Sequence, residues 1–315
     1  MAESKIAVYG AIAANVAIAV TKFTAAGITG SSAMLSEGIH STVDAGNGVL
    51  LLVGMKLSQR KATPEHPFGH GKELYFWSLI VAVLIFGLGG GISAYEGVLH
   101  MLNPAPLHDP TWNYIVLGAA AVFEGGSFAV AMRQFLRETG DLPFWRSLRT
   151  SKDPTTFTVL AEDGAALAGL AVAAVGVYLS HRLALPAIDG AASVVIGVLL
   201  AGVAVLLIRE SRGLLIGEGV APATASAIRD LALRNPRVRG ASSPLSMYLG
   251  PDEILLTLDV EFERDSTADE IVGAIANIEH DIRLRYPNIE RIYIEARSIS
   301  NATRPSNQPR PQEAR

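Results

Sequence analysis

Six long apolar runs constrain what this chain can fold into. A helix needs about 20 apolar residues to cross the hydrocarbon core of a bilayer, and its backbone polar groups must be satisfied within the segment. Residues 1–220 are therefore expected to form a membrane domain of six transmembrane α-helices. The predicted spans are Ile6–Ala26, Ser32–Met55, Leu74–Leu99, Tyr114–Phe135, Phe157–Ser180 and Leu185–Ile208.

Basic residues predict the orientation of these spans. They follow the second, fourth and sixth runs, whereas the opposite side has only Arg182. Cytoplasmic loops of membrane proteins carry an excess of Lys and Arg. We therefore expect both termini to be cytoplasmic and the membrane to be a bacterial inner membrane, with an organelle membrane as the alternative. The residues concerned are Lys56, Arg60, Lys61, Lys72, Arg133, Arg137, Arg146, Arg149, Lys152, Arg209 and Arg212.

The composition changes near residue 221, after which Arg, Asp and Glu recur every few residues. Apolar and polar residues alternate over residues 254–262, which is typical of a half-buried strand. Thr267 and Glu270 have the spacing of a capping box, and an isoleucine stripe with a helical period follows them. Residues 221–300 are thus predicted to form a small cytoplasmic α+β domain in the order helix, strand, strand, helix, strand.

The overall composition excludes some partners and sites. The net charge of −4 gives no indication of nucleic-acid binding, and the absence of cysteine excludes disulfides and thiolate metal ligands. The lipid bilayer is the partner that the composition indicates. Residues 301–315 have almost nothing apolar to bury and are predicted to be a disordered tail.

Four polar residues interrupt the second apolar run on one helical face. Glu37, His40, Asp44 and Asn47 fall within roughly 80° of one another at about 100° per residue. An ionisable side chain inside a membrane costs roughly 2.5–3.5 kcal/mol even on the lenient insertion scale, so a chain that retains one commonly uses it. An imidazole and a carboxylate four residues apart can hold a divalent cation. The spacing therefore indicates a metal site at His40 and Asp44.

Two sequence motifs resemble those of the cation diffusion facilitator family of zinc and related metal transporters. They are LSEGIHSTVD at residues 35–44 and EHPFGHGKEL at residues 65–74. Six spans followed by a cytoplasmic α+β domain belong to the same resemblance, which covers about residues 6–298. The stretch TVLAEDGAALAGL in the fifth run looks like a divergent branch related to a mitochondrial-type zinc transporter.

The resemblance implies a homodimer that exchanges a divalent metal ion for protons by alternating access. It places the transport site at His40, Asp44 and Asp163, and it implies a transporter rather than an enzyme, without a catalytic cofactor. The tail domain lacks the several histidines with which family members often bind zinc, since it has only His280. We predict that it is a dimerisation module without a high-affinity zinc cluster.

The fourth ligand of the transport site is not settled by the motif. The resemblance implies a ligand four residues before Asp163, where this chain has Val159, which cannot bind metal. Glu162 is the favoured replacement, although adjacent residues point about 100° apart on an ideal helix. Asn47 is the next candidate, and Glu37 or a water molecule are alternatives. Such a site suits Zn²⁺, the first candidate for the transported ion, but discriminates less against Mn²⁺, Fe²⁺ or Co²⁺.

A second metal site is implied in the loop after the second span. His66 and His70 lie four residues apart, with Glu65 beside them, and two imidazoles at that spacing can share one Zn²⁺. The family's third ligand position is occupied here by Thr63, so Glu65 is the candidate substitute. The alternative is a structural turn shaped by Pro67 and the glycines that follow it.

Other polar residues in the apolar runs have structural explanations. Asn15 and Lys22 are expected to bond neighbouring helices or to reach the interface, and Asp189 to act at a helix N-terminus. Two other functions fit the same ligands, namely a membrane metalloenzyme and a metal sensor without flux. The enzyme is disfavoured because the spans contain no nucleophile motif and no third histidine.

Overall fold

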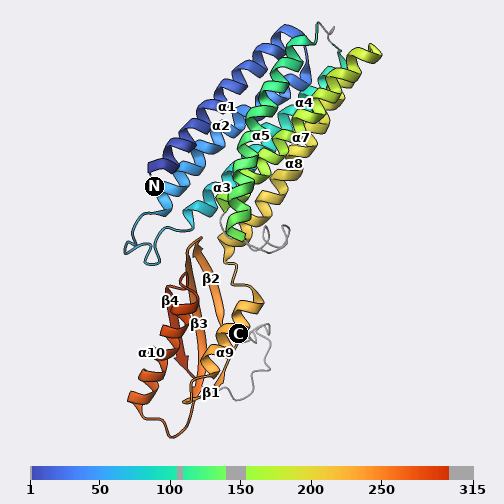
Figure 1. Ribbon diagram of the computed structural model, residues 1–315. Helices are drawn as coiled ribbons and strands as arrows, with labels where there is room; N and C mark the ends of the chain where they lie inside the picture. Colours follow the sequence, from blue (N-terminus) through green and yellow to red (C-terminus); the bar gives the residue numbers. More distant parts are fainter. Residues whose placement is uncertain (1, 105–108, 140–153, 298–315) are drawn as a thin grey trace, which may run out of the picture. The chain divides into compact units, whose positions relative to one another are not determined.

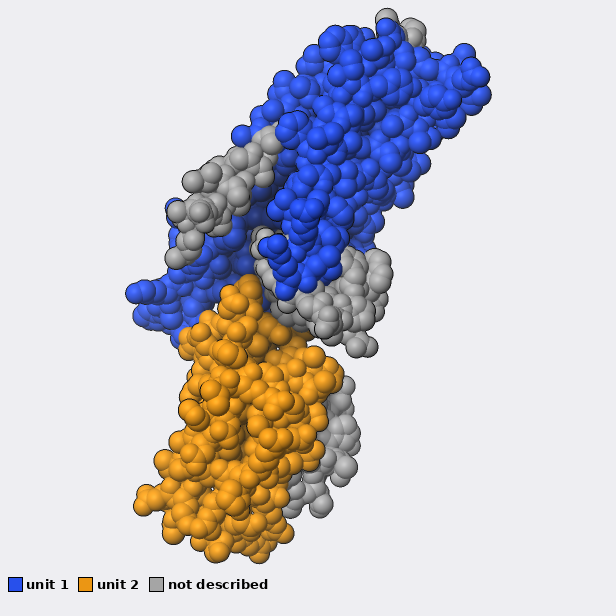
Figure 2. All heavy atoms as spheres, viewed as in Figure 1, with its two compact units in different colours: residues 1–216 blue, residues 217–315 orange. Residues whose placement is uncertain are grey.

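The computed structural model (Figure 1) describes residues 2–104, 109–139 and 154–297. The predicted disordered tail, 301–315, and part of the basic loop before the fifth run lie outside the described residues. The chain divides into two compact units, residues 1–216 and 217–315, which Figure 2 shows in blue and orange. Each unit has its own core and is described separately below.

All six apolar runs are helical in unit 1, where the long helices lie side by side (Figure 1). Among the described residues, four helical segments have the length and apolarity to cross a membrane, and α1 and α2 are not among them. The predicted count of six spans therefore stays a prediction. The elements are α1 (Ala2–Thr29), α2 (Ser32–Ser58), α3 (Glu73–Leu84), the π-helical segment η1 (Ile85–Gly91), α4 (Ile92–Leu102), α5 (Thr111–Thr139), α7 (Pro154–Leu183) and α8 (Ala187–Ile216).

Glycines line the contact between α8 and the continuous helical segment formed by η1 and α4, which is called the glycine seam below. A Cβ atom added at Gly97 would lie 2.7 Å from the carbonyl oxygen of Gly190, and one at Gly197 would lie 2.8 Å from that of Gly90. The two glycines of each helix are seven residues apart, so they lie close to one face. Small residues let membrane helices approach until their backbones touch. The seam thus holds α8 directly against the segment that contains η1.

Unit 2 is a two-layer α+β domain with a four-stranded sheet. Strand β3 is central, because it pairs antiparallel with β1 and β2 and parallel with β4. The predicted order had two strands before the second helix, and this is wrong, since three are present. The shortest of the three, β1, has four residues, too few to show an alternating pattern. The elements are α9 (Pro222–Leu233), β1 (Val238–Ala241), β2 (Leu245–Gly250), β3 (Glu253–Phe262), α10 (Ala268–Arg285) and β4 (Arg291–Ala296).

The core of unit 2 lies between the sheet and its helices. Alternate residues of β3 are buried along its whole length, which confirms the predicted half-buried strand. Ile278 and Ile282 of α10 are buried in the same cluster. The predicted capping box is present at the start of α10, where the side chains of Thr267 and Glu270 bond each other's backbone N–H groups.

Candidate metal site

The start of α2 is held by a buried carboxylate from another helix. Ser31 is the N-cap, and its hydroxyl accepts a bond from the backbone N–H of Met34. The Asp189 carboxylate of α8 accepts hydrogen bonds from the Ser31 hydroxyl at 2.8 Å and from the backbone N–H groups of Ser32 at 2.5 Å and Ala33 at 3.2 Å. A carboxylate there satisfies otherwise unpaired N–H groups and complements the helix dipole. Asp189 therefore has the expected N-terminal role, but for α2 as well as for its own helix.

His40 and Asp44 form a close pair two turns further along α2. The distance between His40 Nε2 and Asp44 Oδ2 is 3.5 Å, and the side chains are 2% and 13% exposed. Three atoms of this pair have no hydrogen-bond partner among the described residues, namely both ring nitrogens of His40 and Asp44 Oδ1. Leaving a buried polar atom unpaired costs about 1–3 kcal/mol. The pair is therefore a buried set of nitrogen and oxygen donors whose bonding capacity is unused.

The two rival candidates for the fourth ligand lie in contact. Asn47 Nδ2 on α2 donates a hydrogen bond of 2.9 Å to Glu162 Oε1 on α7, and both side chains are buried. The adjacent Asp163 bonds elsewhere, because Ser127 of α5 donates to its Oδ2 at 2.8 Å. The two carboxylates thus diverge, as expected for neighbours on a helix. In the part of the chain that the structure describes, no three His, Asp or Glu side chains are grouped closely enough to hold one ion.

A buried charged cluster lies one turn before the His40–Asp44 pair. The ammonium group of Lys22 on α1 donates to Glu37 Oε2 at 2.9 Å, to Ser41 Oγ at 2.9 Å and to Glu124 Oε1 at 3.0 Å. The prediction that Lys22 bonds neighbouring helices agrees with these contacts. Glu124 of α5 was missed, although a lone glutamate inside the apolar run Tyr114–Phe135 is a readable signal.

The loop between α2 and α3 brings its two histidines together. The ring centroids of His66 and His70 are 4.6 Å apart, with the rings tilted by 35°. Thr63 and His66 exchange backbone hydrogen bonds of 3.1 Å, so the loop is also an ordered turn. Glu65 is exposed, and His70 Nδ1 is buried without a hydrogen-bond partner among the described residues. Both interpretations of this loop, a metal site and a structural turn, are therefore compatible with its geometry.

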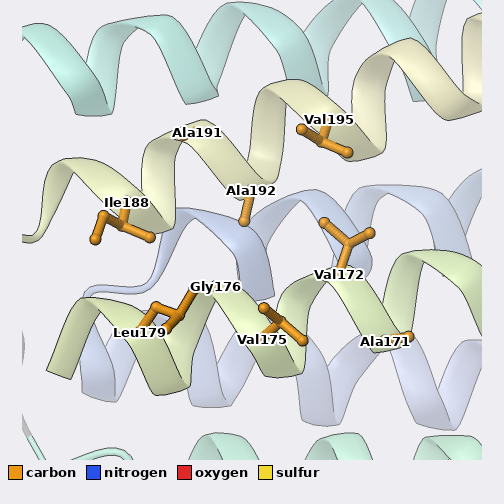
Figure 3. A pocket seen from close by; sticks show the side chains of 9 residues that line it. All are labelled: Ala171, Val172, Val175, Gly176, Leu179, Ile188, Ala191, Ala192 and Val195. Atoms are coloured by element: carbon orange, nitrogen blue, oxygen red, sulfur yellow. The ribbon is translucent and has the colours of Figure 1, made fainter. Parts of the chain in front are cut away.

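A cavity on unit 1 is chemically unsuited to ions. It has a volume of about 390 Å³ and lies between α7 and α8, where Figure 3 shows apolar side chains from both helices around it. Its nine lining residues are Ala, Val, Gly, Leu or Ile, so none offers a side-chain donor to a metal. The polar residues on α2, α5 and α7 are thus the candidate site of unit 1.

Comparisons with known proteins identify the family of this chain. Residues 8–216 match the model of the family described as the cation efflux transmembrane domain. The proton-coupled zinc antiporter SLC30A9, mitochondrial, of Xenopus laevis is 33% identical over 75% of this chain and 42% of that protein. The magnetosome protein MamM of Paramagnetospirillum magneticum is 28% identical over 94% of this chain and 89% of that protein. The chain thus spans less than half the length of the zinc antiporter that it matches.

Among solved structures, a C-terminal domain of MamM in a cadmium form matches 25% of this chain and 98% of that chain, with 19% identity and a TM-score of 0.23. The family match covers the transmembrane part and includes every candidate ligand named above. The chain belongs to the cation diffusion facilitator family of membrane proteins, as the motifs of its second apolar run and of the loop that follows it predict.

Proposed function

We propose that this chain exports a divalent metal ion, Zn²⁺ first, from the cytoplasm in exchange for protons by alternating access. Membership of the cation efflux family supports metal transport, and the name of the zinc antiporter relative supports zinc and proton coupling at 33% identity. The chain acts as a homodimer with six spans and cytoplasmic termini. The membrane is a bacterial inner membrane in this proposal, whereas that relative is mitochondrial.

The observation that carries the proposal is the His40–Asp44 pair. It combines an imidazole and a carboxylate at 3.5 Å inside an apolar helix bundle, with both ring nitrogens and one carboxylate oxygen free of hydrogen bonds among the described residues. A purely structural pair would use these atoms in hydrogen bonds, because unpaired buried donors destabilise the fold. A divalent ion is the ligand that would satisfy nitrogen and oxygen atoms together.

Asp163 and Glu162 of α7 supply the remaining charge in this proposal. Glu162 is the fourth ligand, because its contact with Asn47 turns it toward the polar face of α2. Asn47 then orients the Glu162 carboxylate through its hydrogen bond, as partners of metal ligands commonly do. Asp163 reaches the ion after leaving Ser127, which makes this hydrogen bond part of the conformational cycle. The donor set of one imidazole and three carboxylates also admits Mn²⁺, Fe²⁺ or Co²⁺.

Proton exchange follows from the same ligands. Imidazole nitrogens and carboxylate oxygens must be deprotonated to bind metal, so metal and protons compete for the same atoms. Metal that enters from the cytoplasm displaces protons from the site, and protons on the opposite side help to displace the metal. In the loop, His66, His70 and Glu65 form a peripheral metal site, which modulates transport without lying on the path of the ion.

The test is uptake of Zn²⁺ into proteoliposomes of the full chain under an imposed pH gradient. We expect uptake to depend on the gradient and to be accompanied by proton movement in the opposite direction. Liposomes that bind Zn²⁺ without uptake would favour a membrane metal sensor or a metalloenzyme instead. Parallel assays with Mn²⁺, Fe²⁺ and Co²⁺ would identify the preferred ion.

A further inference from the structure

The Lys22 cluster has a complete set of bonds around its cation. An ammonium group has three N–H donors, and Lys22 has three oxygen acceptors at 2.9–3.0 Å. The side chains of Lys22 and Glu37 are 0% exposed, and that of Glu124 is 10% exposed. The ammonium is therefore a charge fixed in position and shielded from solvent, where charges act over longer distances than in water.

The Lys22 cluster contains more carboxylates than cations. Two glutamates surround one lysine, and Glu37 Oε1 and Glu124 Oε2 have no hydrogen-bond partner among the described residues. Glu37 Oε1 lies against Gly169 of α7, where an added Cβ would approach it to 2.4 Å. An excess of buried negative charge attracts divalent cations, and Lys22 is the group that offsets it.

The cluster lies beside the predicted transport site. Ser41, which accepts one of the lysine bonds, is adjacent to His40 in the sequence, and Glu37 precedes His40 by three residues. The ammonium is therefore bonded within one helical turn of the His40–Asp44 pair along α2. On α5, Glu124 lies three residues before Ser127, which holds Asp163. The fixed charge thus adjoins α2, which carries His40 and Asp44, and α5, which carries the hydrogen-bond partner of Asp163.

We propose that the positive charge of Lys22 limits the affinity of the His40–Asp44 site for divalent metal, so that the bound ion can leave. This inference rests on the proposed function, because it takes these residues to bind the transported ion. A positive charge next to the site raises the free energy of the metal-bound state more than that of the empty state. A transporter that binds its ion too tightly releases it slowly. Lys22 therefore increases turnover by weakening binding.

The experiment compares Lys22→Gln with Lys22→Arg in the full-length protein. Zn²⁺ affinity is measured by calorimetry in detergent, and the KM and kcat of uptake are measured in proteoliposomes. Lys22→Gln should bind Zn²⁺ on the order of tenfold more tightly and show a lower KM together with a lower kcat. Lys22→Arg keeps the charge and should stay near the wild type. The double variant Lys22→Gln with Glu124→Gln removes one charge of each sign and should restore the affinity toward the wild type.

Other outcomes would overturn the inference. If Lys22 only ties α1 to α2 and α5, the variant should lose stability while its folded fraction binds Zn²⁺ with unchanged or weaker affinity. Tight binding that persists when Asp44→Ala is added to Lys22→Gln would place the ion at Glu37 and Glu124, and the inference would be wrong. Wild-type protein that binds Zn²⁺ without flux would contradict the transport proposal, whereas the affinity comparison would still decide the role of Lys22.

Discussion

Unit 1 buries several charged side chains, whereas the described residues of unit 2 include no buried charged side chain. In unit 1 the ion pair of Lys22 and Glu37 is 0% exposed on both sides, whereas in unit 2 the pair of Arg297 and Glu295 is 57% and 58% exposed. Exposed ion pairs contribute about 0–1 kcal/mol, but the desolvation of buried charges costs several kcal/mol per ion. The difference teaches that a buried ion pair such as Lys22 and Glu37 costs free energy that an exposed pair does not, so function is a reason to retain it.

The two units also pack by different means. Unit 2 has a core of branched aliphatic side chains between a sheet and its helices, which the hydrophobic effect drives together in water. Unit 1 has a seam in which Gly90 and Gly97 lie against Gly197 and Gly190. Lipid tails are as apolar as leucine, so association of helices in a membrane depends on close contact rather than on exclusion of water.

The largest expected effect separates a buried acid of unit 1 from an exposed acid of unit 2. Asp44→Ala should abolish Zn²⁺ flux in proteoliposomes while leaving a folded, inserted protein, because it removes one of the ligands and much of the charge that offsets the ion. Asp281→Ala, on the exposed face of α10, should leave flux unchanged. Unchanged flux in Asp44→Ala would remove Asp44 from the transport site.

The next effect concerns Glu162 and its partner. Glu162→Gln keeps an oxygen that can accept the hydrogen bond from Asn47 but removes the charge, so Zn²⁺ affinity should fall on the order of 100-fold. Asn47→Ala removes only the orienting bond and should cost roughly tenfold. Calorimetry on both variants at two pH values measures which substitution weakens Zn²⁺ binding more. A Glu162→Gln protein with wild-type affinity beside a weakened Asn47→Ala would transfer the ligand role to Asn47.

An intermediate effect is expected for the loop, where His66 is exposed and His70 is partly exposed. His66→Ala combined with His70→Ala should reduce the response of transport to metal but retain part of the flux, because the pair lies outside the ion path. The double substitution Arg60→Ala with Lys61→Ala in the same exposed loop serves as the control. Complete loss of flux, equal to that of Asp44→Ala, would make the loop part of the transport site.

A smaller effect tests the packing of the two helices at the glycine seam. Gly197→Ala should destabilise unit 1 by about 1–3 kcal/mol, because its Cβ would meet backbone atoms of Gly90 and Ala94. Gly202→Ala on the same helix has open space and should be neutral or stabilising by about 0.5–1 kcal/mol. The stabilities of the two variants are compared through their thermal unfolding midpoints in detergent. Equal midpoints would show that the seam is not tightly packed.

The smallest effect concerns the cap of α10 in unit 2. Thr267→Ala should speed amide hydrogen exchange in the first turn of α10 roughly fivefold, whereas Thr267→Ser should preserve the cap. The backbone N–H of Thr267 lowers the pKa of Glu270 from its ordinary value of 4.5. The carboxylate therefore stabilises α10 above that value, and the protection should be lost as pH falls through the lowered pKa. Identical exchange in all three proteins would show that the capping box is not formed.

Much of the fold could be predicted from local sequence patterns. The apolar runs predicted every long helix that the structure describes in unit 1, and the alternation around Leu256 and Leu258 predicted β3. These signals work because periodicity depends only on neighbours along the chain. The number of strands was predicted one too low, because a four-residue strand such as β1 shows no period and is stabilised by pairing with β3, a contact between residues distant in sequence.

In the candidate site, too, some features follow from the local sequence and others depend on contacts between helices. The face shared by His40, Asp44 and Asn47 follows from helical geometry alone, so the sequence by itself determined which residues of α2 face one another. Only the tertiary structure decided that Glu162 contacts Asn47 while Asp163 bonds Ser127, and that Glu124 joins Lys22. These contacts connect α1, α2, α5 and α7, and the direction in which a helix turns its side chains toward a neighbour depends on packing. A one-dimensional pattern does not contain that rotation.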